Sequence, residues 1–268
     1  MSLPTKDDLK LDRILRHLDR LFASYSKPHD VRHIDSTRRH MQRVDIHKEL
    51  GELSLVDSDD LRSWLRPLDH LFFGGMIFTN RITPGVEWLM GRTGKDYEDI
   101  LGQVVVESGK ITLRLCPRKH ANSVQFLGTM LHEMVHVFIR QLAIREGVFY
   151  SWTMPSTDCF EVFGKLEGRT GHGYYFQKLA RAVEDRARQL FHCDGIELGR
   201  MRAIVAEYQE TKQIPTGEYF EEILKSPKYP NQPQPEAARD WIVRFDERER
   251  LRALHEAEMK EANNRIFG

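Results

Sequence analysis

The spacing of apolar residues predicts several helices in this chain. Between residues 7 and 25, apolar side chains recur at intervals of three and four, which is typical of an amphipathic helix. Helices are also expected over residues 59–73, 122–146, 174–191 and 196–210. In the helix over 122–146, apolar side chains occupy nearly the whole circumference. A helix of that kind is expected to lie deep inside a domain.

A different pattern precedes this apolar helix. Residues 76–90 are rich in β-branched and aromatic residues and are divided by a Thr-Pro-Gly turn at 83–85, which predicts two strands. Residues 103–106 and 110–116 lie on either side of Ser108-Gly109 and predict a β-hairpin. In the second strand of that hairpin, Ile and Leu alternate with Thr and Arg, so one face is expected to be buried.

Composition limits the classes of function. Of the 268 residues, 40% are hydrophobic, and 40 basic residues balance 40 acidic ones, so no bulk charge attracts nucleic acid or anionic membranes. The 3 cysteines contain no C-x-x-C pair, which excludes a cysteine zinc ribbon and predicts an intracellular, reducing compartment. No signal peptide and no run of 18 apolar residues is found, so we expect no membrane association.

The candidate chemistry lies in the pentapeptide His132-Glu133-Met134-Val135-His136, which reads H-E-x-x-H within the apolar helix. Residues four apart share a face of a helix, so both imidazoles can reach one metal ion with Glu133 beside it. A zinc ion held in this way activates water, and Glu133 is the candidate general base. A chance occurrence would leave costly polar groups without partners on a buried helix.

A catalytic zinc site needs a third protein ligand. The elongated metal-binding motif, which would require a histidine at Leu142, is absent. His172 is favoured because it lies between Gly171 and Gly173 at the start of the next helix, where glycines let the backbone approach closely. The alternative third ligand is a carboxylate from the following segment, for which the candidates are Glu161, Glu167 and Glu184.

These residues carry a resemblance to a known family. The motif block 130–136 and the later Gly-His-Gly-Tyr-Tyr-Phe at 171–176, together with 71–75, the Trp88 strand and 111–115, resemble the SprT-like (Spartan-type) metalloproteases over roughly residues 65–192. The resemblance implies zinc bound by His132, His136 and His172, with Glu133 as the base. It also implies an α+β zincin fold, in which a small, mainly antiparallel sheet packs on helices that include the motif helix.

The resemblance defines the expected organisation. Residues 1–64 are expected to form an N-terminal helical extension and residues 65–195 the catalytic domain, with an insertion at about 148–170. Residues 196–268 are expected to form a charged, helical, proline-containing extension. The cysteine zinc ribbon found at the C-terminus of many family members is missing.

The expected function is that of a zinc metallopeptidase acting on a protein segment, which binds as an extra strand along a sheet edge. The family also implies DNA-associated or DNA-crosslinked substrates, a role in DNA repair and a nuclear location. The first alternative is a non-catalytic zincin scaffold that binds protein or DNA, and the second is a hydrolase of non-peptide amides. Arg38, Arg39 and Arg43 offer contacts to phosphate, but a solvated basic face is the commoner interpretation.

Overall fold

The computed structural model describes residues 6–25, 31–49, 58–78, 83–88, 100–107, 110–116, 119–146 and 166–211, with short pieces between 242 and 255. The chain divides into two compact units, Met1–Arg200 and Met201–Gly268. Helix α7 (Arg200–Thr211) begins at the boundary. Among the helices of these described segments, none is long and apolar enough to cross a membrane.

The first unit is α+β and mostly helical. Its long helices are α1 (Lys6–Ser24), α2 (Val31–Glu49), α3 (Ser58–Phe73), α4 (Ser123–Arg145) and α6 (Tyr174–Phe191). The predictions for α1, α3, α4 and α6 are confirmed to within one or two residues. The helix expected from residue 196 begins only at Arg200, because Ile196–Gly199 is irregular and Gly199 has φ +65°. Helix α2 forms in a polar segment with weak periodicity, and between residues 31 and 45 its buried positions are Thr37 and Val44.

The sheet has three strands in the order β1-β3-β2, namely β1 (Gly85–Trp88), β2 (Gly102–Glu107) and β3 (Lys110–Leu115). The predicted hairpin is confirmed, because β2 pairs antiparallel with β3. Strand β1 pairs parallel with β3, so the sheet is mixed rather than mainly antiparallel. The pattern of a strand does not encode the direction of its neighbour. Of the two strands expected over 76–90, β1 is found, whereas Met76–Phe78 forms a turn.

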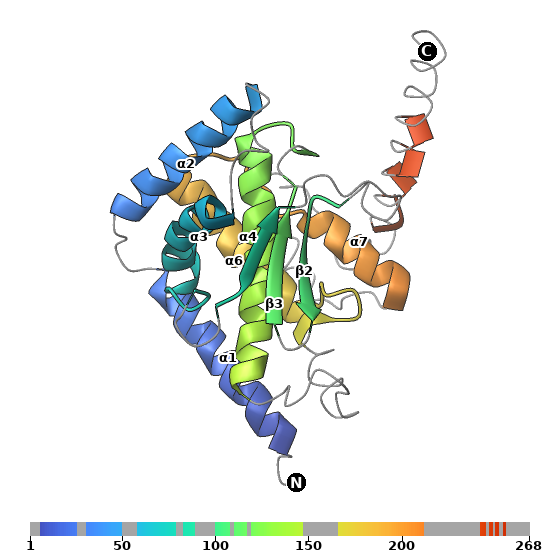
Figure 1. Cartoon of the computed structure of the whole chain (residues 1–268). Helices are drawn as coiled ribbons and strands as arrows, with labels where there is room; N and C mark the ends of the chain where they lie inside the picture. The colour runs from blue at the N-terminus through green and yellow to red at the C-terminus, as the bar shows by residue number, and fades with distance from the viewer. Residues whose placement is uncertain are drawn as a thin grey trace. The chain divides into compact units, whose positions relative to one another are not determined.

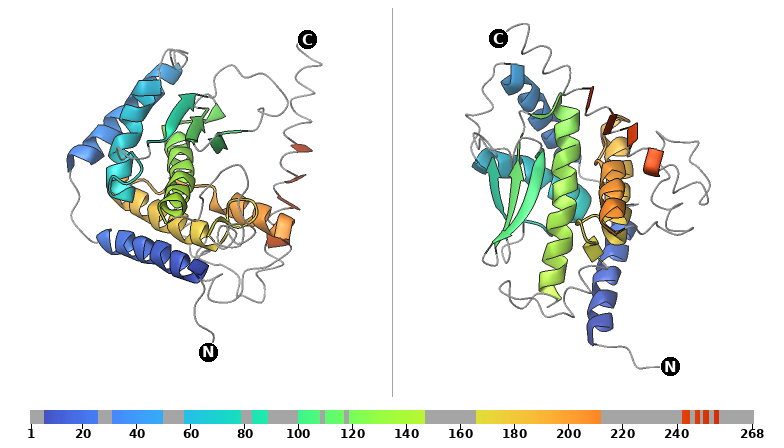
Figure 2. Two further views of the ribbon diagram at one scale, coloured as in Figure 1. Left: turned by 60° about the horizontal axis from the view of Figure 1, so that its bottom comes forward. Right: turned by 90° about the vertical axis from the view of Figure 1, so that its right-hand side faces the viewer.

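Helix α4 is the central element of the first unit. It packs against β2 and β3 on one side and against α6 on another (Figure 1). The right-hand view of Figure 2 shows α4 between the sheet and α6. The apolar residues around α4 are therefore buried on several sides, as the sequence predicts; among them Phe126, Met130, Leu131, Met134 and Val135 are at most 1% exposed.

The N-terminal helices share the hydrophobic core of this unit. Ile14, Leu18 and Leu21 of α1 are buried in the same cluster as the apolar residues of α4. Asp45 of α2 accepts hydrogen bonds from the backbone N–H and the hydroxyl of Ser123, at 3.1 and 2.8 Å. Helix α2 thus provides an acceptor for one of the free N–H groups at the start of α4.

Some expectations concern residues outside the described part of the chain. Of the insertion at 148–170, the structure describes only residues 166–170. Glu161 therefore lies outside the described residues. The proline-containing stretch over 212–235 and most of the charged segment over 236–268 also lie outside the described residues.

Candidate metal centre

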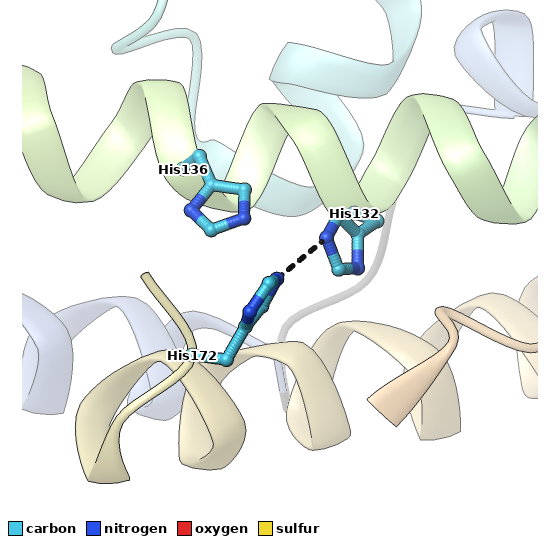
Figure 3. A group of neighbouring side chains, drawn as sticks. All are labelled: His132, His136 and His172. Carbon is cyan, nitrogen blue, oxygen red and sulfur yellow. Dashed lines mark hydrogen bonds between the residues drawn. The ribbon is translucent and has the colours of Figure 1, made fainter. Parts of the chain in front are cut away.

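Three imidazoles from two separate elements converge on one point of the first unit. His132 and His136 project from α4, and His172 lies two residues before α6 begins (Figure 3). One ligand atom from each residue lies within 4.8 Å of the other two. Nε2 of His132 and Nε2 of His172 are 3.3 Å apart. The structure therefore brings the three predicted ligands together.

The start of α4 is defined by local hydrogen bonds. The Asn122 side chain caps the helix by accepting the backbone N–H of Gln125 at 2.9 Å. The Gln125 side chain accepts the N–H of Ala121 at 2.9 Å. Because the helix continues without a break to Arg145, residues 132 and 136 remain one turn apart on the same face.

A tight glycine turn brings His172 to the other two imidazoles. Gly168 and Gly171 have φ values of +76° and +88°, which favour glycine. A Cβ atom on Gly173 would collide with the backbone of Glu167 and Gly168, and the N–H of Gly173 donates to the carbonyl of Glu167. A Cβ atom on Gly171 would lie 3.2 Å from Cε1 of His136. Glycine is therefore needed on both sides of His172.

The outer nitrogen of His132 is held by a backbone carbonyl. Nδ1 of His132 donates to the carbonyl oxygen of Leu198 at 2.6 Å. A carbonyl only accepts, so Nδ1 carries the proton and the lone pair of Nε2 faces the other imidazoles. This arrangement is the orientation that metal-ligating histidines commonly show.

The segment that carries Leu198 is fixed from two sides. Glu184 of α6 accepts the N–H of Leu198 at 2.9 Å and pairs with Arg188 and Arg200 at 2.9 and 3.3 Å. On α4, Gly128 lies so close to this segment that a Cβ atom there would overlap the carbonyl oxygen of Glu197. Glu184 thus holds the backbone segment whose carbonyl group accepts the hydrogen bond from His132.

The other two imidazoles also have outer partners. Nδ1 of His136 lies 3.5 Å from Oε1 of Glu167, without the geometry of a hydrogen bond. Glu167 is fully buried and pairs with Nε of Arg140 at 3.2 Å. Nδ1 of His172 lies 3.2 Å from the hydroxyl of Thr170, which can donate or accept.

The surroundings keep the imidazoles neutral. Burial, with a smaller contribution from His136, lowers the pKa of His132 to about 3. Burial also lowers the pKa of His136 to about 3, with help from Arg140, and lowers that of His172 to about 2. At neutral pH each ring therefore has one unprotonated nitrogen, which is the form that binds a metal.

The side chain of Glu133 on α4 is buried against Gly102, the first residue of β2. A Cβ atom on Gly102 would lie 2.8 Å from Cγ and 3.1 Å from Oε1 of Glu133. Burial raises the pKa of Glu133 to about 8; Arg140 opposes this shift and Glu167 adds to it. A cation bound by the imidazoles would favour the ionised carboxylate of Glu133. Metal binding at this site would therefore lower the pKa of Glu133.

The spacing of His132 and His172 fits a zinc ion. Two nitrogen ligands at the usual zinc distance in tetrahedral geometry are roughly 3.3–3.4 Å apart. The separation of 3.3 Å between His132 and His172 matches that value. Three neutral imidazoles leave one tetrahedral position for water or substrate, whereas a structural zinc site normally has four protein ligands.

Two of the alternative carboxylates have other partners. Glu167 is paired with Arg140, and Glu184 is paired with Arg188 and Arg200. Sequence reasoning missed the supporting roles of both residues and of the Leu198 carbonyl. One signal was present: Gly128 interrupts a buried apolar helix, and such a glycine often marks a close backbone approach.

Compared with known proteins, the chain matches no protein-family model and has no significant match among curated proteins or among solved structures.

Proposed function

We propose that this chain is a zinc-dependent metallopeptidase of SprT-like type that hydrolyses peptide bonds in protein substrates. The observation that carries the proposal is the convergence of His132, His136 and His172 within 4.8 Å, with Glu133 adjacent on the same helix. A structural site would not require this glutamate, so its presence favours hydrolysis over a scaffold role.

A zinc ion held by three imidazoles lowers the pKa of a bound water and polarises a carbonyl oxygen. The protein supplies the remaining functions. Glu133 accepts the proton of the attacking water and delivers it to the leaving amine. Its carboxylate receives no hydrogen bond from the described residues. The Leu198 carbonyl holds the His132 ring in the ligating orientation.

The outer edge of β2 is the proposed docking edge for the substrate backbone. The carbonyl of Leu101 accepts the N–H of Cys116, so backbone groups at Gly102, Val104 and Val106 point away from β3. Arg140 already donates to the Val104 carbonyl at 2.9 Å. An added strand would therefore pair at Gly102, beside Glu133, and at Val106.

The direct test measures zinc content and peptide cleavage on the same preparation. The wild type is expected to bind one zinc ion and to cleave denatured casein or a DNA-crosslinked protein. Glu133→Gln should retain zinc and lose cleavage by about a thousandfold or more, since the general base is removed. Glu146→Gln, at the C-terminal end of α4, is the matched control and should retain activity.

Three outcomes would contradict the proposal in different ways. Absence of zinc from the wild type would refute the metal centre itself. Stoichiometric zinc with no cleavage of any protein substrate, with or without single-stranded DNA, would favour the non-catalytic scaffold. Cleavage of small amides but not of proteins would favour the hydrolase of non-peptide amides.

A further inference from the structure

A buried ion pair lies next to His136, and the proposed peptide hydrolysis uses neither of its members. Glu167, which precedes the glycine turn, is 0% exposed. Arg140 lies one turn after His136 on α4, and its Nε donates to both carboxylate oxygens of Glu167 at 3.2 Å. Taking a carboxylate out of water is costly, and a buried ion pair often adds little stability over apolar residues of similar size. Packing alone therefore does not account for this pair.

Both members of the pair are also fixed by contacts outside it. Nη1 of Arg140 donates to the carbonyl oxygen of Val104 on β2 at 2.9 Å. The main-chain carbonyl of Glu167 accepts the N–H of Gly173, which closes the turn before α6. The guanidinium group is thus anchored to the sheet, and Glu167 is anchored to the turn that carries His172. These contacts hold the carboxylate of Glu167 in a defined position.

The neighbouring imidazole of His136 has an unsatisfied nitrogen. Its Nδ1 is buried and has no hydrogen-bond partner among the described residues. This atom lies 3.5 Å from Oε1 of Glu167, which is about 0.6 Å longer than an ordinary N–H···O hydrogen bond. Nδ1 of His132, by contrast, already donates to the carbonyl of Leu198. Because buried N–H groups are normally paired, a proton on Nδ1 of His136 requires an acceptor, and Glu167 is the carboxylate that faces it.

The packing of the His136 ring restricts how this nitrogen can be satisfied. The fully buried ring of Phe176 stacks on the imidazole with centroids 4.3 Å apart and an interplanar angle of 26°. Gly171 lies so close to its edge that a Cβ atom there would be 3.2 Å from Cε1. The ring is therefore confined on one face and at one edge. A small rotation within its own plane would close the gap to Glu167 and keep the contact with Phe176.

We propose that Glu167, held by Arg140, is a positioning residue that accepts the Nδ1–H of His136 when a metal ion is bound. This role rests on the proposed zinc centre. Ligation through Nε2 places the proton on Nδ1, and metal-ligating histidines usually donate that proton to a carboxylate, a carbonyl or water. A direct bond from Glu167 to the metal is disfavoured, because both of its oxygens already accept from Arg140. Glu167 thus orients a ligand and does not itself bind the ion.

The test compares two Glu→Gln variants of the full chain. Glu167→Gln removes the charge of the acceptor beside His136. Glu146→Gln is the matched control, because Glu146 is also largely buried and also lies beside an arginine and a histidine, Arg13 and His17, at 3.6 and 3.5 Å. Glu146 follows the last turn of α4, roughly 15 Å beyond His136.

Two measurements separate orientation of the ligand from general stability. Chelator competition should give a zinc dissociation constant about tenfold or more higher in Glu167→Gln and unchanged in Glu146→Gln. In zinc-loaded protein with isotope-labelled histidine, the Nδ1–H proton of His136 should resonate far downfield and exchange slowly with water, and both properties should weaken in Glu167→Gln. The Nδ1–H signal of His132, which is bonded to Leu198, should stay in place as the internal reference.

A double variant keeps the test decisive if Glu167→Gln folds poorly. Apolar residues of similar size often replace a buried ion pair without loss of stability, so Arg140→Met/Glu167→Met should keep the thermal midpoint of the wild type. This double variant lacks the acceptor, so its zinc affinity should still fall by about tenfold or more.

The outcomes distinguish this role from the metal centre on which it rests. Weaker zinc binding in the double variant, together with a displaced His136 signal in Glu167→Gln, supports the role of Glu167. Unchanged zinc affinity in the double variant, or a loss of equal size in Glu146→Gln, overturns that role and leaves the metal centre intact. A wild type that binds no zinc overturns both.

Discussion

The imidazole of His132 donates a hydrogen bond of 2.6 Å to the carbonyl oxygen of Leu198, 66 residues further along the chain. This contact links the metal-binding face of α4 to the segment that follows α6. It also fixes the tautomer that exposes Nε2 of His132 to the other imidazoles. The candidate metal centre therefore depends on the position of a backbone segment that contributes no ligand.

Glu184 is expected to control zinc affinity from behind His132. Replacing Glu184 with Gln removes the charge that holds Leu198, Arg188 and Arg200. Outer-shell changes of this kind weaken metal binding by about 10–100-fold. Competition with a chromophoric chelator measures this affinity. The thermal midpoint should also fall, because the buried side chains of Arg188 and Arg200 both lose the carboxylate of Glu184.

The neighbouring Asp185 provides the control for that experiment. Its carboxylate is 37% exposed and pairs with Arg181 at 3.5 Å and, at the longer distance of 3.9 Å, with Arg188. Asp185→Asn should change the unfolding free energy by about 0.5 kcal/mol or less and leave zinc affinity unchanged. Equal zinc affinity in the Glu184 and Asp185 variants would disprove a positioning role for Glu184.

Gly128 is expected to tolerate no side chain. A Cβ atom there overlaps the carbonyl oxygen of Glu197, so Gly128→Ala must displace the segment that carries Leu198. Overpacking of this kind costs about 1–3 kcal/mol, and the displacement should also weaken zinc binding. Urea unfolding and the chelator competition measure the two effects separately.

Gly195 is a matched position for the Gly128 substitution. The nearest atom to a Cβ on Gly195 is 3.8 Å away, which is ordinary contact. Gly195→Ala should therefore leave both stability and zinc affinity close to those of the wild type. If Gly128→Ala also leaves stability and zinc affinity unchanged, Glu197 does not lie as close to α4 as described here.

The ligands could be predicted from sequence because their signals are local. His132 and His136 share a helical face through their spacing alone. His172 was identifiable because flanking glycines permit the sharp turn that a third ligand needs. Chain-local patterns also predicted the bounds of α4 and α6 and the β2–β3 hairpin, for which a short connection and alternation are sufficient.

The supporting contacts could not be predicted in the same way. The carbonyl of Leu198 is a backbone group, so the residue name carries no information about its acceptor role. The sequence indicates Glu184 only as an alternative ligand, because a carboxylate on the next helix fits either role. The parallel pairing of β1 with β3 depends on where the chain returns, which alternation within a strand does not specify.

Removing the metal is expected to destabilise the first unit. Zinc that binds the folded state but not the unfolded state stabilises the folded state by about 4 kcal/mol when the free zinc concentration is one thousand times the dissociation constant. Adding a chelator should therefore lower the thermal midpoint of the wild type, and adding zinc should restore it. His172→Ala should lack this zinc-dependent shift.

An exposed histidine gives the comparison for the metal-removal experiment. His192 lies just after α6 with φ +51°, a conformation that asparagine also accepts. His192→Asn should keep the full zinc-dependent shift. Zinc dependence that persists in His172→Ala would show that this residue is not a ligand.

The last prediction concerns Tyr25, which joins α1 to the rest of the first unit. Its hydroxyl donates to the carbonyl of Phe72 at 2.7 Å, and burial raises the pKa of the phenol above its usual value near 10. Above about pH 10 the unfolded chain releases this proton and the folded chain keeps it. The contribution of Tyr25 to stability is therefore present at neutral pH and is lost as the pH rises beyond that value.

Tyr25→Phe removes this pH dependence and leaves the other tyrosines in place. At neutral pH the variant should be about 1 kcal/mol less stable, because the hydrogen bond to Phe72 is lost. Above about pH 10 the wild type should lose this advantage at about 1.4 kcal/mol per pH unit relative to the variant. Urea midpoints of both proteins at about pH 8 and about pH 11 test the difference. Parallel pH profiles would mean that the Tyr25 phenol is solvated and that α1 does not dock at Phe72, which would remove α1 from the unit that holds the metal centre.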